Sequence, residues 1–371
     1  MGDQTEMKEN SKSLVLIGGG HTHALVMLRL RDDLPKGTHL TVIDPKPHAV
    51  YSGMLPGFIA GHYKRNDLDI DLQKLATELG GTYIQGAATA IDPDQKQITL
   101  HTGESIQYAV ASIDVGITSN MPNLDGFAEH ALPAKPLAKL SAAWDAFRHS
   151  CSEPKVAVIG GGVAGAELAM AMAYELKRQK KTYSVTVFDR GEILTGASAA
   201  TRRRIKRAFR KFGITVREQA GITEVTKDGL VLSDGEQVTA NLVVGAAGAL
   251  PHPWLQDTGL QLENGYLNVN SCLQTSDPAI FAAGDCTHFQ AQPLPKAGVY
   301  AVRKSPVLGD NLIASLTDRQ LSEYEPQSDF LKLISLGDKI AIAQKHGWSF
   351  SGRWAWLLKD YIDTKFMKSF Q

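Results

Sequence analysis

The chain has 371 residues, of which 43% are hydrophobic and 21% are charged, with 34 glycines. This length predicts two domains, or three if one is small, and the composition is typical of a globular protein and excludes a disordered or collagen-like chain. Lysine plus arginine equals aspartate plus glutamate at 39 each, so there is no excess positive charge for a phosphate backbone. We therefore expect no nucleic-acid partner.

The cysteines and the hydropathy pattern indicate a cytoplasmic protein. The three cysteines, Cys151, Cys272 and Cys286, are far apart and odd in number, which predicts no disulfide framework. The first 13 residues are polar, and we interpret them as a loose tail without a secretory signal. No run of about 18 apolar residues occurs, so contact with a membrane is expected to be peripheral if it exists.

Two stretches of the chain repeat the same order of elements. Residues 14–17 predict a strand that ends in three glycines before a helix, and residues 40–43 predict a second strand that ends at Asp44. The order recurs with a strand over 156–159, a second glycine triplet, a helix, and a strand over 185–188 that ends at Asp189. Two parallel strand–helix–strand units are therefore predicted, in an α/β fold.

The segments around these units are less regular. A helix is expected over 71–79, strands near 98–100 and 109–114, a proline-spaced linker from Met121, a basic helix over 201–213 to which we assign no function, and hairpin-like strands around Gly229 and Gly235. The apolar stretch LVVGAAGA predicts one more strand, and the aromatic segment from Pro326 a small cap.

The second glycine turn has the pattern of a dinucleotide-binding turn. Gly160, Gly162 and Gly165 form GxGxxG between a strand and a helix, with Glu167 directly behind. Such a turn lets the backbone approach a pyrophosphate, and the helix N-terminus supplies N–H donors. Asp189 is placed to accept the ribose 2′-hydroxyl, whereas Arg190 could attract a 2′-phosphate, so we expect a weak preference for NADH over NADPH.

The first glycine turn departs from this pattern at its third position. Gly18 and Gly20 are present, but His23 replaces the third glycine, and Asp44 still closes the second strand. One interpretation is that His23 only tolerates a wider gap between helix and strand; the other is that an imidazole lies beside the cofactor. We favour the first for His23 and expect His21, at the helix start, to belong to the cofactor site.

The motifs together resemble the pyridine nucleotide-disulfide reductase superfamily of flavoproteins. The two glycine turns and the segment IFAAGDC support this, and the resemblance implies that Gly284 and Asp285 bind the ribityl chain of FAD. The redox cysteine pair of the disulfide reductases is missing, so the sequence is most similar to the type II NADH dehydrogenase branch. The segments VYSGMLPGFIAGHY and PLPKAGVYAVRKSPVLGDNL resemble the selenide, water dikinase-associated FAD/NAD(P) oxidoreductases.

The resemblance implies a domain order and two cofactors. FAD is expected in a domain built from residues 12–150 and 271–325, and NAD(P)H in a Rossmann-like domain of residues 151–270 inserted between them, with a cap over 326–371. Hydride transfer belongs to the cofactors, so the protein mainly positions them. No metal site is expected.

Three residues are candidates for the catalytic site. Lys296 precedes a predicted helix near Gly298 and could place a cation at the flavin edge, although it could equally be an exposed surface lysine. Tyr51 and Pro56 lie in the loop after Asp44 and could wall the flavin ring, or could simply fill the core. Cys286 is interpreted as a small buried packing thiol.

We expect an FAD-dependent NAD(P)H dehydrogenase that passes electrons to a small-molecule acceptor, most plausibly a quinone. The alternatives are reduction of a sulfur- or selenium-containing small molecule, a sulfide:quinone type enzyme, disfavoured by the missing cysteine pair, and a non-enzymatic flavin-bearing partner. The sequence leaves a homodimer open.

The C-terminal segment predicts an amphipathic helix. Apolar side chains recur at helical spacing from Trp354 to Phe370, whereas Lys359, Asp363, Lys365 and Lys368 lie largely elsewhere. Such a helix suits a membrane surface or a partner. The competing interpretation, slightly favoured, docks it on the FAD domain or on a second subunit.

Overall fold

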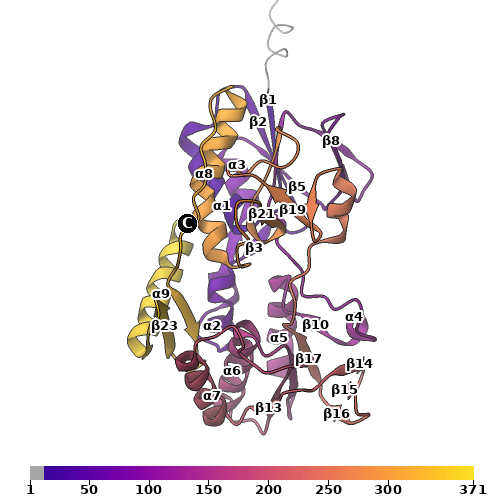
Figure 1. Cartoon of the computed structure of the whole chain (residues 1–371), viewed down its shortest axis with the longest axis vertical. Coiled ribbons are helices and arrows are strands. Elements are labelled where there is room, and N and C mark those ends of the chain that lie inside the picture. Colours follow the sequence, from indigo (N-terminus) through magenta and orange to yellow (C-terminus); the bar gives the residue numbers. More distant parts are fainter. Residues whose placement is uncertain (1–11) are drawn as a thin grey trace, which may run out of the picture.

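The structure is a computed structural model that describes residues 12–371, and the expected N-terminal tail lies outside this range except at its last two residues. Two five-stranded parallel sheets form the two halves of the molecule, one above the other in Figure 1. The first sheet has the order β20 (Ile280–Ala282), β9 (Val110–Ile113), β1 (Lys12–Ile17), β2 (Thr38–Asp44) and β5 (Thr82–Gln85). The second has the order β10 (Leu132–Pro133), β17 (Leu242–Gly245), β11 (Lys155–Ile159), β12 (Ser184–Phe188) and β13 (Thr215–Arg217).

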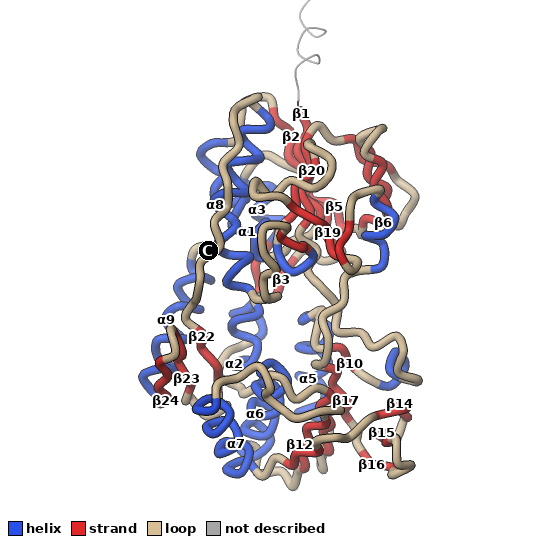
Figure 2. The backbone as a smooth tube through the Cα atoms, viewed as in Figure 1, coloured by secondary structure: helices blue, strands red, loops and turns tan. Residues whose placement is uncertain are grey.

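Both predicted strand–helix–strand units are present. α1 (His21–Asp33) connects β1 to β2, and α6 (Val163–Arg178) connects β11 to β12. β1 and β11 are almost wholly buried because each lies in the interior of its sheet with strands on both sides. Helices lie around the sheets, as Figure 2 shows. The remaining helices are α2 (Leu55–Ile59), α3 (Leu72–Glu78), α4 (Phe127–His130), α5 (Leu137–Ser150), α7 (Ala199–Phe212), α8 (Gly298–Leu316) and α9 (Arg353–Lys368).

Smaller sheets of two or three strands accompany the two large sheets. They are β3 (His48–Val50) with β4 (Asp69–Asp71), β6 (Ala88–Asp92) with β7 (Gln97–Leu100) and β8 (Ser105–Gln107), β14 (Ile222–Thr226) with β15 (Gly229–Leu232) and β16 (Gln237–Thr239), and β18 (Leu262–Glu263) with β19 (Tyr266–Val269) and β21 (Thr287–Phe289). The sheets to which β10, β18 and β19 belong bear on the expected domain boundaries at residues 151 and 271. β10 precedes residue 151 but belongs to the second sheet, and β18 and β19 precede residue 271 but share a sheet with β21, which pairs with β19.

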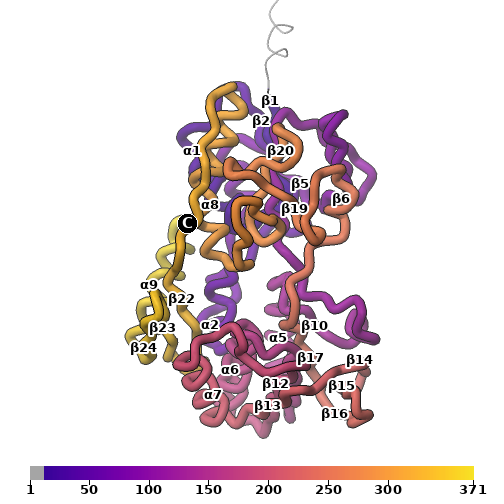
Figure 3. Tube along the Cα trace, in the orientation of Figure 1, coloured from indigo at the N-terminus to yellow at the C-terminus, as the bar shows by residue number. Residues whose placement is uncertain are grey.

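The C-terminal segment forms a compact cap beside the second half. Its antiparallel sheet consists of β22 (Lys332–Ser335), β23 (Ala341–Lys345) and β24 (Trp348–Gly352), followed by α9. In Figure 3 the yellow end of the chain descends from α8 and lies beside α7 and α2. Thr201 at the start of α7 donates to Gln344 of β23, which ties the cap to the second half. α9 is the helix that the sequence predicts near the C-terminus.

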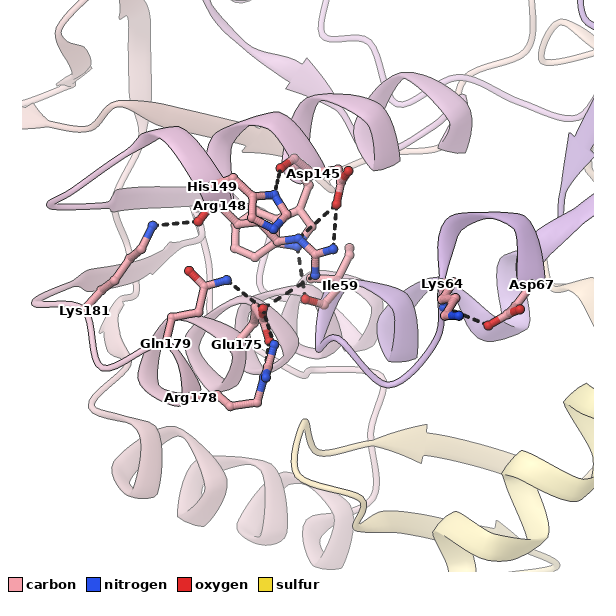
Figure 4. Close-up of polar contacts among 11 residues, drawn as sticks. Ile59, Lys64, Asp67, Asp145, Arg148, His149, Glu175, Arg178, Gln179 and Lys181 are labelled. Atoms are coloured by element: carbon pink, nitrogen blue, oxygen red, sulfur yellow. Dashed lines mark hydrogen bonds and ion pairs between the residues drawn. The ribbon is translucent and has the colours of Figure 1, made fainter.

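A polar cluster around the buried Glu175 joins α6 to α5 beside α2 (Figure 4). Glu175 of α6 is 1% exposed and accepts hydrogen bonds from Arg178 and Gln179, and the Arg148 guanidinium of α5 lies 3.6 Å away. Trp144 of α5 donates its indole N–H to the carbonyl of Ile59 in α2. These contacts connect α2 and α5 to α6 through groups that would be costly to bury alone.

Candidate functional site

The two glycine turns are built in the same way. The first glycine of each has a positive φ, +89° at Gly18 and +110° at Gly160, which an L side chain rarely adopts. Gly18 donates to Ile43 at the end of β2, and Gly160 donates to Phe188 at the end of β12. Each turn is thereby held against the strand that carries the acidic residue.

The two acidic residues also have matching partners. One carboxylate oxygen of Asp44 accepts from the Gly19 N–H at 2.7 Å, and one of Asp189 accepts from the Gly161 N–H, also at 2.7 Å. The second oxygen of each accepts from an N–H two residues later in the chain. Each carboxylate oxygen can still accept another bond, as a ribose hydroxyl would require. The pKa of Asp44 is raised, mainly by burial.

A cavity of about 440 Å³ opens at the first turn. This volume is within the usual range for ligand pockets. Its lining includes the glycine turn, Asp44, Gly284, Asp285 and the N-terminal part of α8. Gly284 has φ +72°, and a Cβ there would lie 2.1 Å from Asp114. Glycine is therefore required where the two segments meet.

The donor set of the first turn suits an anionic cofactor. Asp114, at the end of β9, accepts the N–H groups of Thr22 and His23 through one carboxylate oxygen. Within residues 12–371 the N–H of His21 has no partner in the first turn of α1, and His21 lines the cavity. A free helix N-terminal N–H beside glycines fits a pyrophosphate. The residues present thus fit FAD.

His23 does not line this cavity. It is fully buried, and its ring nitrogens lie 2.7 Å from the Gly18 carbonyl and 2.7 Å from the Ser112 hydroxyl. Burial lowers its pKa. The imidazole therefore braces the turn from beneath, where the third glycine of the second turn, Gly165, packs directly on Gly160. This agrees with the interpretation of His23 as a structural residue.

Asp285 lines the cavity and is paired with Lys135. Their side chains are 2.7 Å apart, and both belong to the lining. Lys135 lies in the linker between the sheets, where the sequence carries no motif that indicates it. Asp114 is also absent from the residues predicted for the site, although an acidic residue at the carboxyl end of a parallel strand is a pattern that indicates a ligand site.

The second turn is more open. Gly162 is exposed, and the N–H groups of residues 163–165 in the first turn of α6 have no partner within the described chain. Asp189 lies at the end of β12 and Arg190 is exposed beside it. This arrangement suits a second dinucleotide that binds at the surface.

Glu167 faces the cap and lies away from the first cavity. It accepts a hydrogen bond of 2.6 Å from the N–H of Ser335 in β22. Burial raises its pKa to about 7, against the lowering effect of Lys359. Its role in cofactor binding stays a prediction.

The three candidate catalytic residues occupy different surroundings. Lys296 donates to the carbonyl of Thr287 and lies 3.8 Å above the ring of Tyr266, and burial lowers its pKa. Tyr51 donates to Asp363 of α9 at 3.0 Å, and its ring stacks on Phe366. Pro56 lies in α2 next to this loop. None of the three is among the residues that line the 440 Å³ cavity, whereas Val50 and Ser52 are.

No group of three acidic, cysteine or histidine side chains that could hold a metal occurs in residues 12–371. No helix in that range is long and apolar enough to cross a membrane.

Comparison with known proteins places the chain in a family. Residues 12–305 match the pyridine nucleotide-disulphide oxidoreductase family. The demethylphylloquinone reductase NdbB of Synechocystis is 24% identical over 378 residues, which cover 96% of this chain and 92% of that protein. The nitric oxide reductase FlRd-NAD(+) reductase of Aeromonas hydrophila is 31% identical over 55% of this chain and 52% of its own length.

Solved structures show the same fold. The sulfide:quinone oxidoreductase of Aquifex aeolicus superposes with a TM-score of 0.77 at 19% identity, over 97% of this chain and 91% of that one. NDH2 of Plasmodium falciparum in complex with NADH also gives 0.77, at 15% identity, over 96% and 98%. The chain therefore belongs to the pyridine nucleotide-disulphide oxidoreductase family, as an FAD-dependent NAD(P)H oxidoreductase.

Proposed function

We propose that this enzyme passes electrons from NAD(P)H through FAD to a quinone. FAD takes the cavity at the first glycine turn, with its pyrophosphate at His21 and the glycines and its ribityl chain at Asp285. NAD(P)H takes the second turn, with its ribose at Asp189. FAD supplies the hydride-accepting chemistry when bound, and the residues around it bind, orient and handle protons.

The observation that supports a quinone is the group of large apolar side chains that α9 exposes while it buries an ion pair of Lys359 with Asp363. A surface helix normally turns its polar face to water and its apolar face to the core. In α9 the inward face is partly polar: beside the buried Trp356 and Met367, Lys359 donates to the carbonyl of Gly53 at 2.6 Å and to Asp363 at 2.7 Å. Asp360 on the same side accepts from Tyr63. The side chains of Lys359 and Asp363 are 12% and 6% exposed.

The outward face of α9 carries large apolar side chains together with the cations Arg353, Lys365 and Lys368. Trp354 is 81% exposed and Tyr361 is 61% exposed, and neighbouring β24 adds Trp348 at 85%. Among the described residues, the large apolar side chains that are exposed all belong to this cap, apart from Leu250. An apolar patch beside buried polar groups suits a lipophilic acceptor that needs protons on reduction, and suits the surface of a membrane in which it dissolves.

The inner face of α9 also leads to the first cavity. Asp363 holds the hydroxyl of Tyr51, and the rings of Tyr51 and His21 meet edge to face at 5.4 Å between centroids. His21 in turn lines the cavity. We assign Tyr51 and Pro56 to the wall between the flavin and the acceptor, and Lys296 to the electrostatics on the side of α8.

The state of Cys286 supports direct electron transfer from the flavin to the acceptor, without a cysteine intermediate. Cys286 is fully buried and donates to the carbonyl of Ala283, and burial raises its pKa to about 12. A thiol in this state is protonated at neutral pH and is a weak nucleophile. This supports an acceptor that reacts with the flavin itself.

Anaerobic reduction tests the proposal. The protein is reduced with NADH or NADPH while flavin absorbance is followed, and then mixed with quinones, a disulfide or a selenium-containing acceptor. Rapid reoxidation by quinones alone is expected. Reoxidation by the sulfur or selenium compound alone would overturn the quinone and favour the alternative acceptor, and flavin that NAD(P)H does not bleach would overturn the enzyme.

Vesicles test the membrane surface separately. The double variant Trp354→Gln/Tyr361→Gln removes exposed apolar area and leaves Lys359 and Asp363 in place. We expect the wild type, but not this variant, to co-sediment with anionic vesicles, while both reduce a water-soluble quinone equally. Leu250→Gln, which removes an exposed leucine outside the cap, serves as the control. A wild type that does not bind anionic vesicles at low salt would contradict the membrane surface.

A further inference from the structure

Lys304 is a buried lysine in α8 without a carboxylate partner. The residue is 3% exposed. In the described part of the chain, no carboxylate oxygen lies within 4 Å of its ammonium group. Its Nζ donates to the hydroxyl of Thr287 at 3.2 Å and lies 5.6 Å from the ring centroid of Phe289 and 5.9 Å from that of Tyr324. A lysine is rarely buried without an ion pair, so its charge needs another explanation.

Lys304 does not line the cofactor cavity but connects to it through Thr287 and Gly284. Gly298 and Ala301 of α8 line that cavity, and Lys304 follows at the next helical step on the same face. Thr287, which Lys304 holds, donates its hydroxyl to the carbonyl of Gly284. Lys304 therefore braces the turn that carries Asp285 from behind.

The charges around Lys304 are positive or already satisfied. Lys296 binds the carbonyl of the same Thr287. Asp285 is paired with Lys135, Asp114 accepts two N–H groups of α1, and Cys286 is a protonated thiol. Burial lowers the pKa of Lys304 to about 8, so the amine can gain or lose a proton near neutral pH.

We propose that Lys304 is a positioning residue that couples proton uptake by the protein to reduction of the flavin. The inference rests on the proposed FAD site but not on the identity of the acceptor. Transfer of a hydride, which is two electrons and one proton, from NAD(P)H would leave an additional negative charge on a flavin bound in the cavity. The neutral Lys304 amine would balance that charge by taking a proton from solvent. Lys296 and Lys304, which both donate to Thr287, thus lie where their positive charge would stabilise the negative charge of a reduced flavin.

Proton uptake on anaerobic reduction tests this coupling. The holoenzyme is reduced with NADH, whose oxidation to NAD⁺ releases no proton, in weak buffer with a pH indicator, at pH 6.5 and at pH 9. The bound flavin's midpoint potential is measured across the same range. We expect the wild type to take up nearly one more proton per flavin at pH 9 than at pH 6.5, because a lysine with a pKa of about 8 is mostly neutral at the higher pH.

The variants separate charge from structure. Lys304→Arg keeps the positive charge at both pH values and is expected to lose the additional uptake. Lys304→Met should also lose it and should lower the midpoint potential most at pH 6.5. Lys332→Met is the matched control, because Lys332 lies over the ring of Phe330 but is itself exposed at the start of β22. Equal uptake by the wild type at the two pH values would overturn the proposal even if no variant folds, and so would unchanged uptake in Lys304→Arg. Failure to bind FAD would instead overturn the proposed site.

Discussion

Asp285 contributes one carboxylate to two contacts at the cofactor cavity. It pairs with Lys135 at 2.7 Å and lines the cavity at the expected ribityl chain. Asp285→Ala should weaken FAD binding by about 1.5–3 kcal/mol, the usual value of hydrogen bonds to a charged group, and should leave Lys135 unpaired. Flavin content after purification and fluorescence titration of the apoprotein measure this loss.

The control for Asp285 is Asp285→Asn, which keeps hydrogen-bonding capacity and should lose less. Glu104→Ala, at an exposed position away from the cavity, should change nothing. Full flavin occupancy with unchanged affinity in Asp285→Ala would contradict the assignment.

Asp189 determines the expected choice between the two nicotinamide cofactors. Its oxygens are oriented by the N–H groups of Gly161 and Gly191 at 2.7 and 2.8 Å, so a 2′-phosphate would meet a fixed negative charge. We expect kcat/KM to favour NADH, and Asp189→Ala to reduce that preference. Steady-state rates with both cofactors measure it. A tenfold preference of the wild type for NADPH would show that Arg190 dominates instead.

At single positions, the sequence predicts what depends on local backbone chemistry. Gly18, Gly160, Asp44 and Asp189 could be predicted because a tight turn needs glycine and a strand end presents its next side chain to the ligand edge. Lys135 could not, because its pairing with Asp285 joins residues 150 positions apart. No local pattern encodes such a contact.

At the scale of elements, Glu175 holds α5 and α6 together. It is 1% exposed and bonded to Arg178 and Gln179, with Arg148 alongside. Glu175→Ala should destabilise the protein by about 3 kcal/mol, because removing one partner of a buried ion cluster leaves uncompensated charge. Urea unfolding measures it. Glu78→Ala, which breaks the half-exposed pair with Arg31, should cost under about 1 kcal/mol, and an equal loss in both variants would refute the argument.

The C-terminal helix shows what periodicity can and cannot predict. The spacing from Trp354 to Phe370 predicts the helix, but the expected apolar stripe is divided, because Phe366 stacks on Tyr51 while Trp354 is exposed. It does not predict which face is inward, because that depends on Tyr51, Tyr63 and Gly53 in a loop about 300 residues earlier. The helix docks through a mixed face, in which Trp356 and Met367 are buried together with Asp363, and leaves Trp354 and Tyr361 exposed.

At the scale of the whole molecule, Glu167 connects the second half to the cap. It lies on α6, accepts from Ser335 of β22, and is influenced by Lys359 and Asp363 of α9. Burial raises its pKa from 4.5 to about 7, so between these pH values the folded protein binds a proton that the unfolded chain releases. Stability therefore contains a contribution that is present below pH 4.5 and is lost as the pH rises to about 7.

Replacing the carboxyl by an amide should remove this pH dependence. At one unit of pKa per 1.36 kcal/mol, the difference between the wild type and Glu167→Gln should change by up to about 3 kcal/mol from pH 4.5 to pH 8. Urea unfolding across that range measures it, and the exposed Glu129→Gln serves as the control. If the wild type and Glu167→Gln keep a constant difference, Glu167 is ionised throughout. The cap would then rest on a charged carboxylate, held by Ser335 and attracted by Lys359, rather than on a protonated one.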